Sequence, residues 1–231
     1  MDHSIIVEKF GIRLRPVQLR DAGFILNLRN SPYASGFIGD SAKTEASQKD
    51  WLNSYFTRPG DYYFIIELAG NRQEVGTIGI YAVRDGSGEF GRLIILPGFP
   101  AAPASQWLIL HVSFDILGLD VVRTTTVESN KNVISILERT GIHFTGTLEP
   151  CVIAGSPVNL RVYRTTRAEW PLISANLTRY ALMAERLSYK DSTAVECNPT
   201  QKGSNASTDF RRSIPPPLGD GSAGQIDKSP M

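Results

Sequence analysis

The sequence predicts a mixed α/β (α+β) domain, in which a mostly antiparallel central sheet of six to seven strands is flanked by helices. Three observations support this prediction. Three apolar segments between residues 62 and 96 are separated by short Gly-containing turns, which is typical of an antiparallel meander. Residues 93–142 then alternate strand, loop, helix, strand and helix, a pattern that favours a right-handed crossover between neighbouring parallel strands. From Lys190 onward the composition turns polar and rich in Pro and Gly, which indicates a tail outside the domain.

The first 60 residues predict one strand and two helices. Apolar side chains alternate with arginines over residues 12–17, as they do in a half-buried strand. Asp21 can cap a helix whose apolar residues lie on one face. A Gly-containing connection over residues 33–44 leads to a second helix at about residues 46–57.

The meander consists of strands at residues 62–68, 75–83 and 89–96. The last strand ends in a short, β-branched apolar run that is typical of a buried strand. Pro97 and Gly98 end it, because proline cannot donate to a ladder.

A loop of small residues and prolines, residues 99–105, leads to a helix whose apolar side chains cover most of its circumference. Gly118 ends this helix, and residues 121–127 predict the next strand. The second helix of the unit begins near Asn130, whose side chain can cap free N–H groups, and ends at Gly141.

The remaining chain predicts a strand pair at residues 144–148 and 160–166, followed by a C-terminal helix. The expected organisation is an N-terminal extension at 1–11, a domain at 12–170, a helix at 171–189 and a disordered tail at 190–231.

Composition limits the classes of function. The 231-residue chain has a net charge of +1, so its charge gives no case for nucleic-acid or membrane binding. Cys151 and Cys197 lie far apart and the three histidines are scattered, so neither a disulfide framework nor a metal site is expected. Without a long apolar run or a signal peptide, a soluble cytoplasmic protein is expected.

Three motifs resemble the GCN5-related N-acetyltransferases (GNAT), most closely the branch with ribosomal-protein alanine and nucleotide-linked amino-sugar acetyltransferases. The first is Gly91-Arg92-Leu93-Ile94. The second is Ser113-Phe114-Asp115-Ile116-Leu117-Gly118-Leu119, similar to the branch's Ala-Phe-x-x-Leu-Gly-Leu. The third is Asn130 followed by Leu137-Glu138-Arg139-Thr140-Gly141-Ile142, similar to Leu-Glu-Lys-x-Gly-Phe after an Asn.

This resemblance implies acetyl-CoA as co-substrate, held by backbone groups. The loop departs from the family pattern, since Pro97 and Pro100 replace the expected Arg or Gln and Gly, whereas Ala102 fits. Pro103 removes a further amide. The groups expected to contact the cofactor are Ile94, Ile95, Leu96, Gly98, Ala101, Ala102, Ala104, Ser105, Gln106 and Asn130. Asn130 can equally act as a helix cap alone.

Acetyl transfer to an amine needs a proton acceptor, a donor for the carbonyl oxygen and a leaving thiolate. Glu89, at the start of the central strand, is the expected base, with a solvated carboxylate as the alternative. Glu67 is a weaker candidate. A backbone N–H within residues 94–96 is the expected oxyanion donor, and Leu137 stands where many members have a Tyr acid.

Arg29 and Asn30 are the expected substrate-binding residues, because they follow a helix into the expected cleft wall and resemble the Leu-Arg-Asn of sugar-nucleotide acetyltransferases. The acceptor expected first is a small-molecule amine, with a nucleotide-linked amino sugar favoured, and a homodimer is allowed for. Two alternatives remain open: a protein N-terminal acetyltransferase, and a non-catalytic binding module whose altered loop no longer holds the cofactor.

Overall fold

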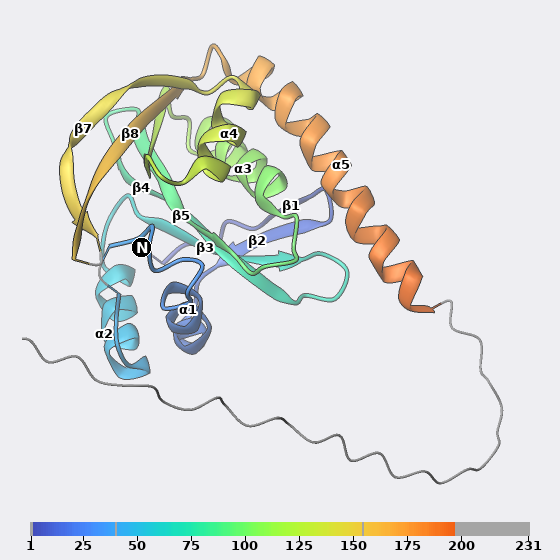
Figure 1. Ribbon diagram of the computed structural model, residues 1–231, viewed down its shortest axis with the longest axis horizontal. Coiled ribbons are helices and arrows are strands. Elements are labelled where there is room, and N and C mark those ends of the chain that lie inside the picture. The colour runs from blue at the N-terminus through green and yellow to red at the C-terminus, as the bar shows by residue number, and fades with distance from the viewer. Residues whose placement is uncertain (1, 40, 154, 197–231) are drawn as a thin grey trace, which may run out of the picture. The chain divides into compact units, whose positions relative to one another are not determined.

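The computed structural model describes residues 2–39, 41–153 and 155–196, and in these residues the fold is built on one eight-stranded sheet (Figure 1). The strand order is β1-β2-β3-β4-β5-β6-β8-β7, and only β5 and β6 pair in parallel. The mostly antiparallel sheet and its single parallel crossover are therefore confirmed, and the sheet has eight strands instead of the expected six to seven. The strands are β1 (Val7–Lys9), β2 (Ile12–Pro16), β3 (Tyr62–Leu68), β4 (Glu74–Arg84), β5 (Ser87–Ile95), β6 (Val121–Val127), β7 (His143–Ile153) and β8 (Ser156–Thr166).

Helices cover both faces of the sheet (Figure 1). On one face, apolar residues of α1 and α2 pack with Tyr63 and Ile65 of β3. On the other face, α3, α4 and α5 enclose the larger core, which contains Phe64 and Ile66 of the same strand. Alternate residues of β3 thus face opposite layers, as the period of a strand requires. The helices are α1 (Ala22–Arg29), α2 (Glu45–Phe56), α3 (Ala102–His111), α4 (Lys131–Thr140) and α5 (Trp170–Glu196).

The two ends of the domain differ from the sequence-based expectation. Val7–Lys9, placed in an N-terminal extension, forms the edge strand β1 and pairs with Ile12–Leu14 of β2. The C-terminal helix, expected to stop at residue 189, continues as α5 to Glu196. The rest of the predicted disordered tail, residues 197–231, lies outside the described residues. Among the described helices, none has the length and apolar character needed to span a membrane.

Candidate active site

The centre of the sheet opens where β5 and β6 part. These strands pair only at Ser87–Val121, Gly88–Val122 and Glu89–Arg123 in the described chain. Beyond Glu89, Phe90 to Leu93 of β5 and Thr124 to Val127 of β6 line a cavity instead of pairing. We call this opening the wedge. No side-chain pattern in the sequence predicts this feature of the fold.

A β-bulge shapes the β5 side of the wedge. Thr77 and Gly79 of β4 are two residues apart, whereas their partners Ile94 and Gly91 on β5 are three apart. Arg92 lies within the extra length, with a φ of 55°, and its carbonyl accepts a hydrogen bond from the Thr77 hydroxyl at 2.9 Å. Because a bulge bends its strand and re-aims a side chain, it helps to turn β5 away from β6.

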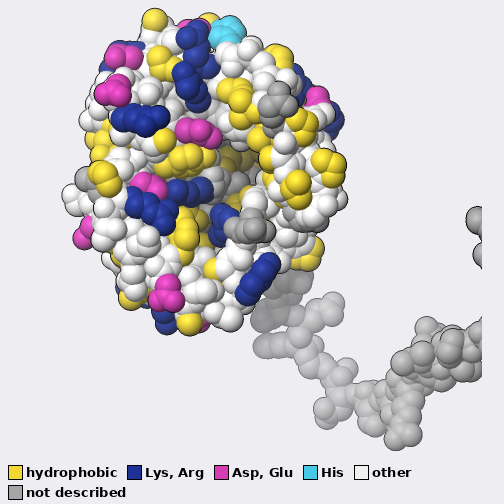
Figure 2. All heavy atoms as spheres, turned by 90° about the vertical axis from the view of Figure 1, so that its left-hand side faces the viewer, with side chains coloured by type: hydrophobic (Ala, Val, Ile, Leu, Met, Phe, Trp, Pro, Cys, Tyr) yellow, Lys and Arg dark blue, Asp and Glu magenta, His cyan; other side chains and the backbone are white. Residues whose placement is uncertain are grey.

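The wedge contains two cavities with a common wall. The inner cavity, of about 160 Å³, lies between β5 and β6. The outer cavity, of about 310 Å³, reaches Ala102 at the first turn of α3. Phe37, Ile38, Leu93, Asn130 and Val133 line both. Figure 2, which views the side of the molecule that carries β7, β8 and α2, shows a hollow with hydrophobic side chains at its base and Lys or Arg side chains near its rim.

The loop that leads into α3 is shorter than expected. Helix α3 begins at Ala102, so Pro103 lies in its first turn, where a missing N–H costs no helical hydrogen bond. Pro97 and Pro100 are exposed, and none of the three prolines is among the residues that line the wedge. The altered loop therefore leaves the wedge clear.

The early start of α3 changes which amides are available. The Ser105 N–H donates to the Ala101 carbonyl at 3.0 Å, and Gln106 lies inside the helix, so these amides are not the free donors that were expected. Helix geometry leaves the N–H groups of Ala102 and Ala104 without a carbonyl four residues back. The first turn of α3 thus retains donors and a positive dipole end for an anionic group.

Only some of the remaining residues predicted to contact the cofactor line the wedge. Ile94 and Ile95 line the outer cavity, as does Ala102. The Leu96 N–H donates to the Val75 carbonyl of β4 at 2.8 Å, so it is not a free donor either. Because successive N–H groups of a strand point to opposite edges, the N–H of Ile95 faces the wedge. Gly98 is exposed, and Ala101 and Ala104 are buried.

The position of Asn130 is compatible with both roles considered for it, the cap of α4 and a contact with the cofactor. Its side chain accepts a hydrogen bond from the Val133 N–H at 3.3 Å, which confirms the helix cap of α4. The same residue lines both cavities of the wedge. Gly141 ends the helix with a φ of 89°, as expected.

Glu89 lies where β5 and β6 part, and it is not a fully solvated carboxylate. It is half-buried and accepts a hydrogen bond from the Tyr81 hydroxyl of β4 at 3.0 Å. Burial raises the pKa of Tyr81, and the Glu89 carboxylate raises it further, so Tyr81 stays protonated and donates. A side chain on Gly91 would come within 2.7 Å of the Tyr81 oxygen, so this contact needs glycine there.

Arg92 marks a second pocket on the α1–α2 face of β5. Its guanidinium lies over the rings of Tyr81, Tyr63 and Trp51, with centroid distances of 4.6, 5.0 and 5.4 Å. Asp61 binds it through two hydrogen bonds of 2.5 and 2.9 Å. Burial lowers the pKa of Arg92, but the Asp61 carboxylate outweighs this effect and the net pKa is raised, so the group is a permanent cation.

The pocket beside Arg92 measures about 150 Å³ and is lined by Ile25, Arg29, Ser41, Ala42, Gln48, Trp51, Tyr63 and Arg92. Of the two predicted substrate residues, the structure brings Arg29 to this pocket. Asn30 does not line it. Its amide donates to the Leu26 and Ala42 carbonyls at 3.0 and 2.9 Å, which ties residue 42 of the pocket wall to the end of α1.

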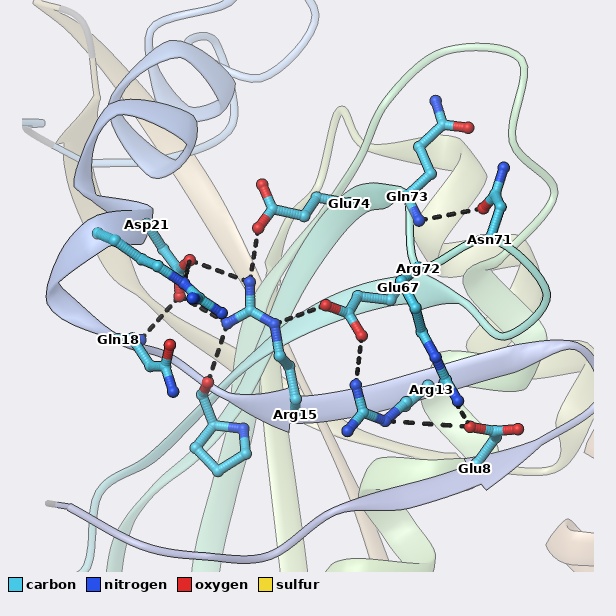
Figure 3. Close-up of polar contacts among 12 residues, drawn as sticks. Glu8, Arg13, Arg15, Gln18, Asp21, Glu67, Asn71, Arg72, Gln73 and Glu74 are labelled. Carbon is cyan, nitrogen blue, oxygen red and sulfur yellow. Dashed lines mark hydrogen bonds and ion pairs between the residues drawn. The ribbon is translucent and has the colours of Figure 1, made fainter.

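Glu67, the weaker candidate base, belongs to a buried ionic cluster (Figure 3). One oxygen accepts from Arg15 Nε and the other from Arg13 Nη1, both at 2.6 Å. Arg15 also contacts Asp21 at 2.7 Å and Glu74 at 2.5 Å. Because arginines hold both oxygens of Glu67, its surroundings indicate a structural role. Among the described residues, no group of three His, Cys, Asp or Glu side chains is placed to hold a metal.

Comparison with known proteins agrees with this geometry. The chain matches the family model for an acetyltransferase (GNAT) domain over residues 12–143, more than half of its length. No curated protein sequence matches it.

Solved structures share the fold at low sequence identity. A putative acetyltransferase from T. thermophilus is 24% identical, with a TM-score of 0.64 over 78% of this chain and 98% of that one. FdhC, described as a nucleotide-linked sugar GNAT, is 24% identical, with a TM-score of 0.63 over the same shares. A spermidine N-acetyltransferase SpeG variant from Vibrio cholerae is 20% identical, with a TM-score of 0.63 over 71% of this chain and 98% of that one.

Proposed function

This chain belongs to the GNAT acetyltransferase family, and from that membership we propose that it transfers an acetyl group from acetyl-CoA to the primary amine of a small molecule. The observation that supports this most directly is the position of β5 between two cavities. Arg92 of its bulge lines the inner cavity of the wedge and also the pocket under α1 and α2. A donor in the wedge and an acceptor in the pocket would meet across this strand.

The residues around β5 fit the three needs of acyl transfer. Acetyl-CoA supplies the activated thioester. Glu89, held by Tyr81, takes the proton of the amine, directly or through water. The Ile95 N–H faces the wedge and is the backbone donor that we assign to the carbonyl oxygen. Leu137 is fully buried in the core, so the thiolate takes its proton from water or another group.

The lining of the pocket favours an acceptor with phosphate groups. It presents the Arg29 side chain and the rings of Trp51 and Tyr63, beside the Arg92 guanidinium that Asp61 holds. Guanidinium groups match phosphate oxygens, and aromatic faces stack on bases. None of the described lining residues is a carboxylate, which a polyamine or an N-terminal ammonium group would require. We therefore propose a nucleotide-linked amino sugar as the acceptor.

Acetyl-CoA titration by calorimetry tests the donor half of this proposal. We expect binding of about −8 kcal/mol, a micromolar Kd. The acceptor half is tested by following thiol release with a nucleotide-linked amino sugar, with the same sugar phosphate lacking the nucleotide, with spermidine and with a peptide N-terminus. The nucleotide-linked sugar should react fastest. Preference for spermidine or the peptide would contradict the acceptor class, and absence of acetyl-CoA binding would contradict the function itself.

A further inference from the structure

One side chain in the wedge is buried without a hydrogen-bond partner. Gln106 on α3 is completely buried, and it lines the inner cavity with Gly91 of β5 and Thr124 of β6. Neither its Oε1 nor its Nε2 has a partner within the described chain. Its helix neighbours Trp107 to Leu110 are apolar core residues, so an apolar side chain would suit this position at least as well.

An unpartnered carboxamide at a buried site needs an explanation, because buried polar groups are almost always hydrogen-bonded. Most other buried polar side chains are satisfied, and apart from Gln106 the exceptions among the described residues are His3, Ser105 and Thr165. Thr77 donates to the Arg92 carbonyl, Ser113 donates to the Ile109 carbonyl, and Arg15 contacts three carboxylates. Of the unpartnered buried side chains in the described residues, only Gln106 lines the wedge, where a cavity of about 160 Å³ adjoins it. Its missing partner therefore belongs in that cavity.

We propose that the side chain of Gln106 binds a secondary amide of an extended ligand in the wedge, and that this ligand is the pantetheine arm of acetyl-CoA. A carboxamide offers one accepting oxygen and a donating NH₂ group. A secondary amide presents one N–H and one carbonyl, which is the complementary set, and the pantetheine arm carries such amides. This assignment rests on the proposed function and adds a side-chain contact to the backbone groups and Asn130 expected at this site.

The assignment separates affinity from stability. Replacing Gln106 with an apolar residue of similar shape removes two unsatisfied polar groups from the empty protein, so the ligand-free variant should be at least as stable as the parent protein. The same replacement removes the partner of the bound amide, so it should weaken a ligand that carries the pantetheine arm. A residue with only a packing role would not show these opposite effects.

The experiment compares Gln106→Met with Thr165→Val as a matched control. The Thr165 hydroxyl on β8 is also buried without a partner in the described chain, but it does not line the wedge. Each protein is titrated by calorimetry with CoA and with adenosine 3′,5′-bisphosphate, which has the nucleotide end of CoA but no pantetheine arm. Urea unfolding of the ligand-free proteins accompanies the titrations. Gln106→Leu serves as a second variant if Gln106→Met does not fold.

We expect Gln106→Met to weaken CoA about 5- to 50-fold, as the loss of one or two buried hydrogen bonds does, and to leave adenosine 3′,5′-bisphosphate unchanged. Thr165→Val should bind both ligands like the parent. Unchanged CoA affinity in Gln106→Met would overturn the assignment and indicate a buried water as the partner. Equal weakening of both ligands would overturn it as a general distortion. A parent protein that binds no CoA would remove the proposed function and this assignment together.

Discussion

Two glutamates of the sheet have opposite surroundings at the scale of single residues. Glu67 on β3 has both oxygens bound by arginines, and its side chain is 7% exposed. Glu89 on β5 is half-buried at the point where the wedge begins, and the structure shows one hydrogen bond to it, from a neutral tyrosine. The first carboxylate is committed to an ionic cluster, whereas the second keeps acceptor capacity for a proton.

This contrast predicts opposite effects of two substitutions: Glu67→Gln should lower stability, and Glu89→Gln should lower kcat. Glu67→Gln should cost about 3 kcal/mol of unfolding free energy, because it breaks a buried ion pair and leaves cationic partners with less compensation. Its kcat per folded molecule should stay unchanged. Glu89→Gln should lower kcat by about 10²- to 10⁴-fold with little loss of stability. Urea unfolding and steady-state kinetics measure both quantities, and a kcat loss in Glu67→Gln alone would reverse the assignment.

Sequence reasoning identified these residues unequally. Glu89 and Arg29 could be named because each lies at the end of a recognisable element. The Tyr81–Glu89 contact and the aromatic cage of Arg92 could not, because both depend on bulges that shift the β4–β5 register. The sequence predicts a contact through the backbone amide of Gln106, but this amide lies inside the helix and the side chain lines the wedge.

At the scale of elements, α4 links stability to ligand binding through its N-cap. Asn130→Ala should destabilise the protein by about 1 kcal/mol, since it removes the acceptor of the Val133 N–H. Asn130→Ser should keep most of the cap. If Asn130 also contacts the cofactor, both variants should weaken acetyl-CoA in calorimetry, although only Asn130→Ala should lower the urea midpoint. Parent-like affinity in Asn130→Ser would restrict Asn130 to its capping role.

Element boundaries could be predicted where side chains encode them. Asn130 and Gly141 delimit α4 as expected, because a capping side chain and a left-handed glycine are local signals. The start of α3 was not predicted, because Pro100 and Pro103 indicated a loop, whereas proline is compatible with the first turn of a helix. The edge strand β1 is three residues long and partly exposed, so it has too little periodicity to read.

At the scale of the whole molecule, buried tyrosines limit stability at high pH. Burial raises the pKa of Tyr55, Tyr63 and Tyr81 above the usual value near 10. Burial and the Glu138 hydrogen bond raise the pKa of Tyr163 to about 12. At a pH between the tyrosine pKa values of the unfolded chain and the raised values of the folded protein, the unfolded chain has lost protons that the folded protein retains. The free energy of unfolding is therefore full below pH 10 and falls as pH rises.

Urea midpoints at pH 8, 9.5 and 11 should therefore decline above pH 10, with the transition remaining reversible. Tyr163→Phe should reduce this decline because its phenol no longer titrates. Tyr33→Phe is the matched control, because this substitution removes the hydroxyl of a tyrosine that is 38% exposed. An equal decline in all three proteins would show that Tyr163 does not contribute.

The order of elements predicted the antiparallel meander and the parallel crossover from β5 to β6. It did not predict β1, the place of β8 between β6 and β7, or the lengths of β7, β8 and α5. The wedge itself could not be predicted from the order of elements. Residues 90–95 and 124–127 have ordinary strand compositions, and the separation of β5 from β6 is a matter of backbone path. The hydrogen-bond ladder between β5 and β6 stops after Glu89 without any change in the alternation of side chains, so the sequence pattern does not predict where it stops.

The short ladder between β5 and β6 also bears on how much this protein can vary. Beyond Glu89, the wedge-facing edge of β5 consists of peptide groups that every residue except proline supplies equally. A ligand recognised at such an edge places little demand on side-chain identity. Substitution can then proceed along β5 and in the loop before α3 while the family architecture is kept. Solved structures share this fold with the chain at 20 to 24% identity.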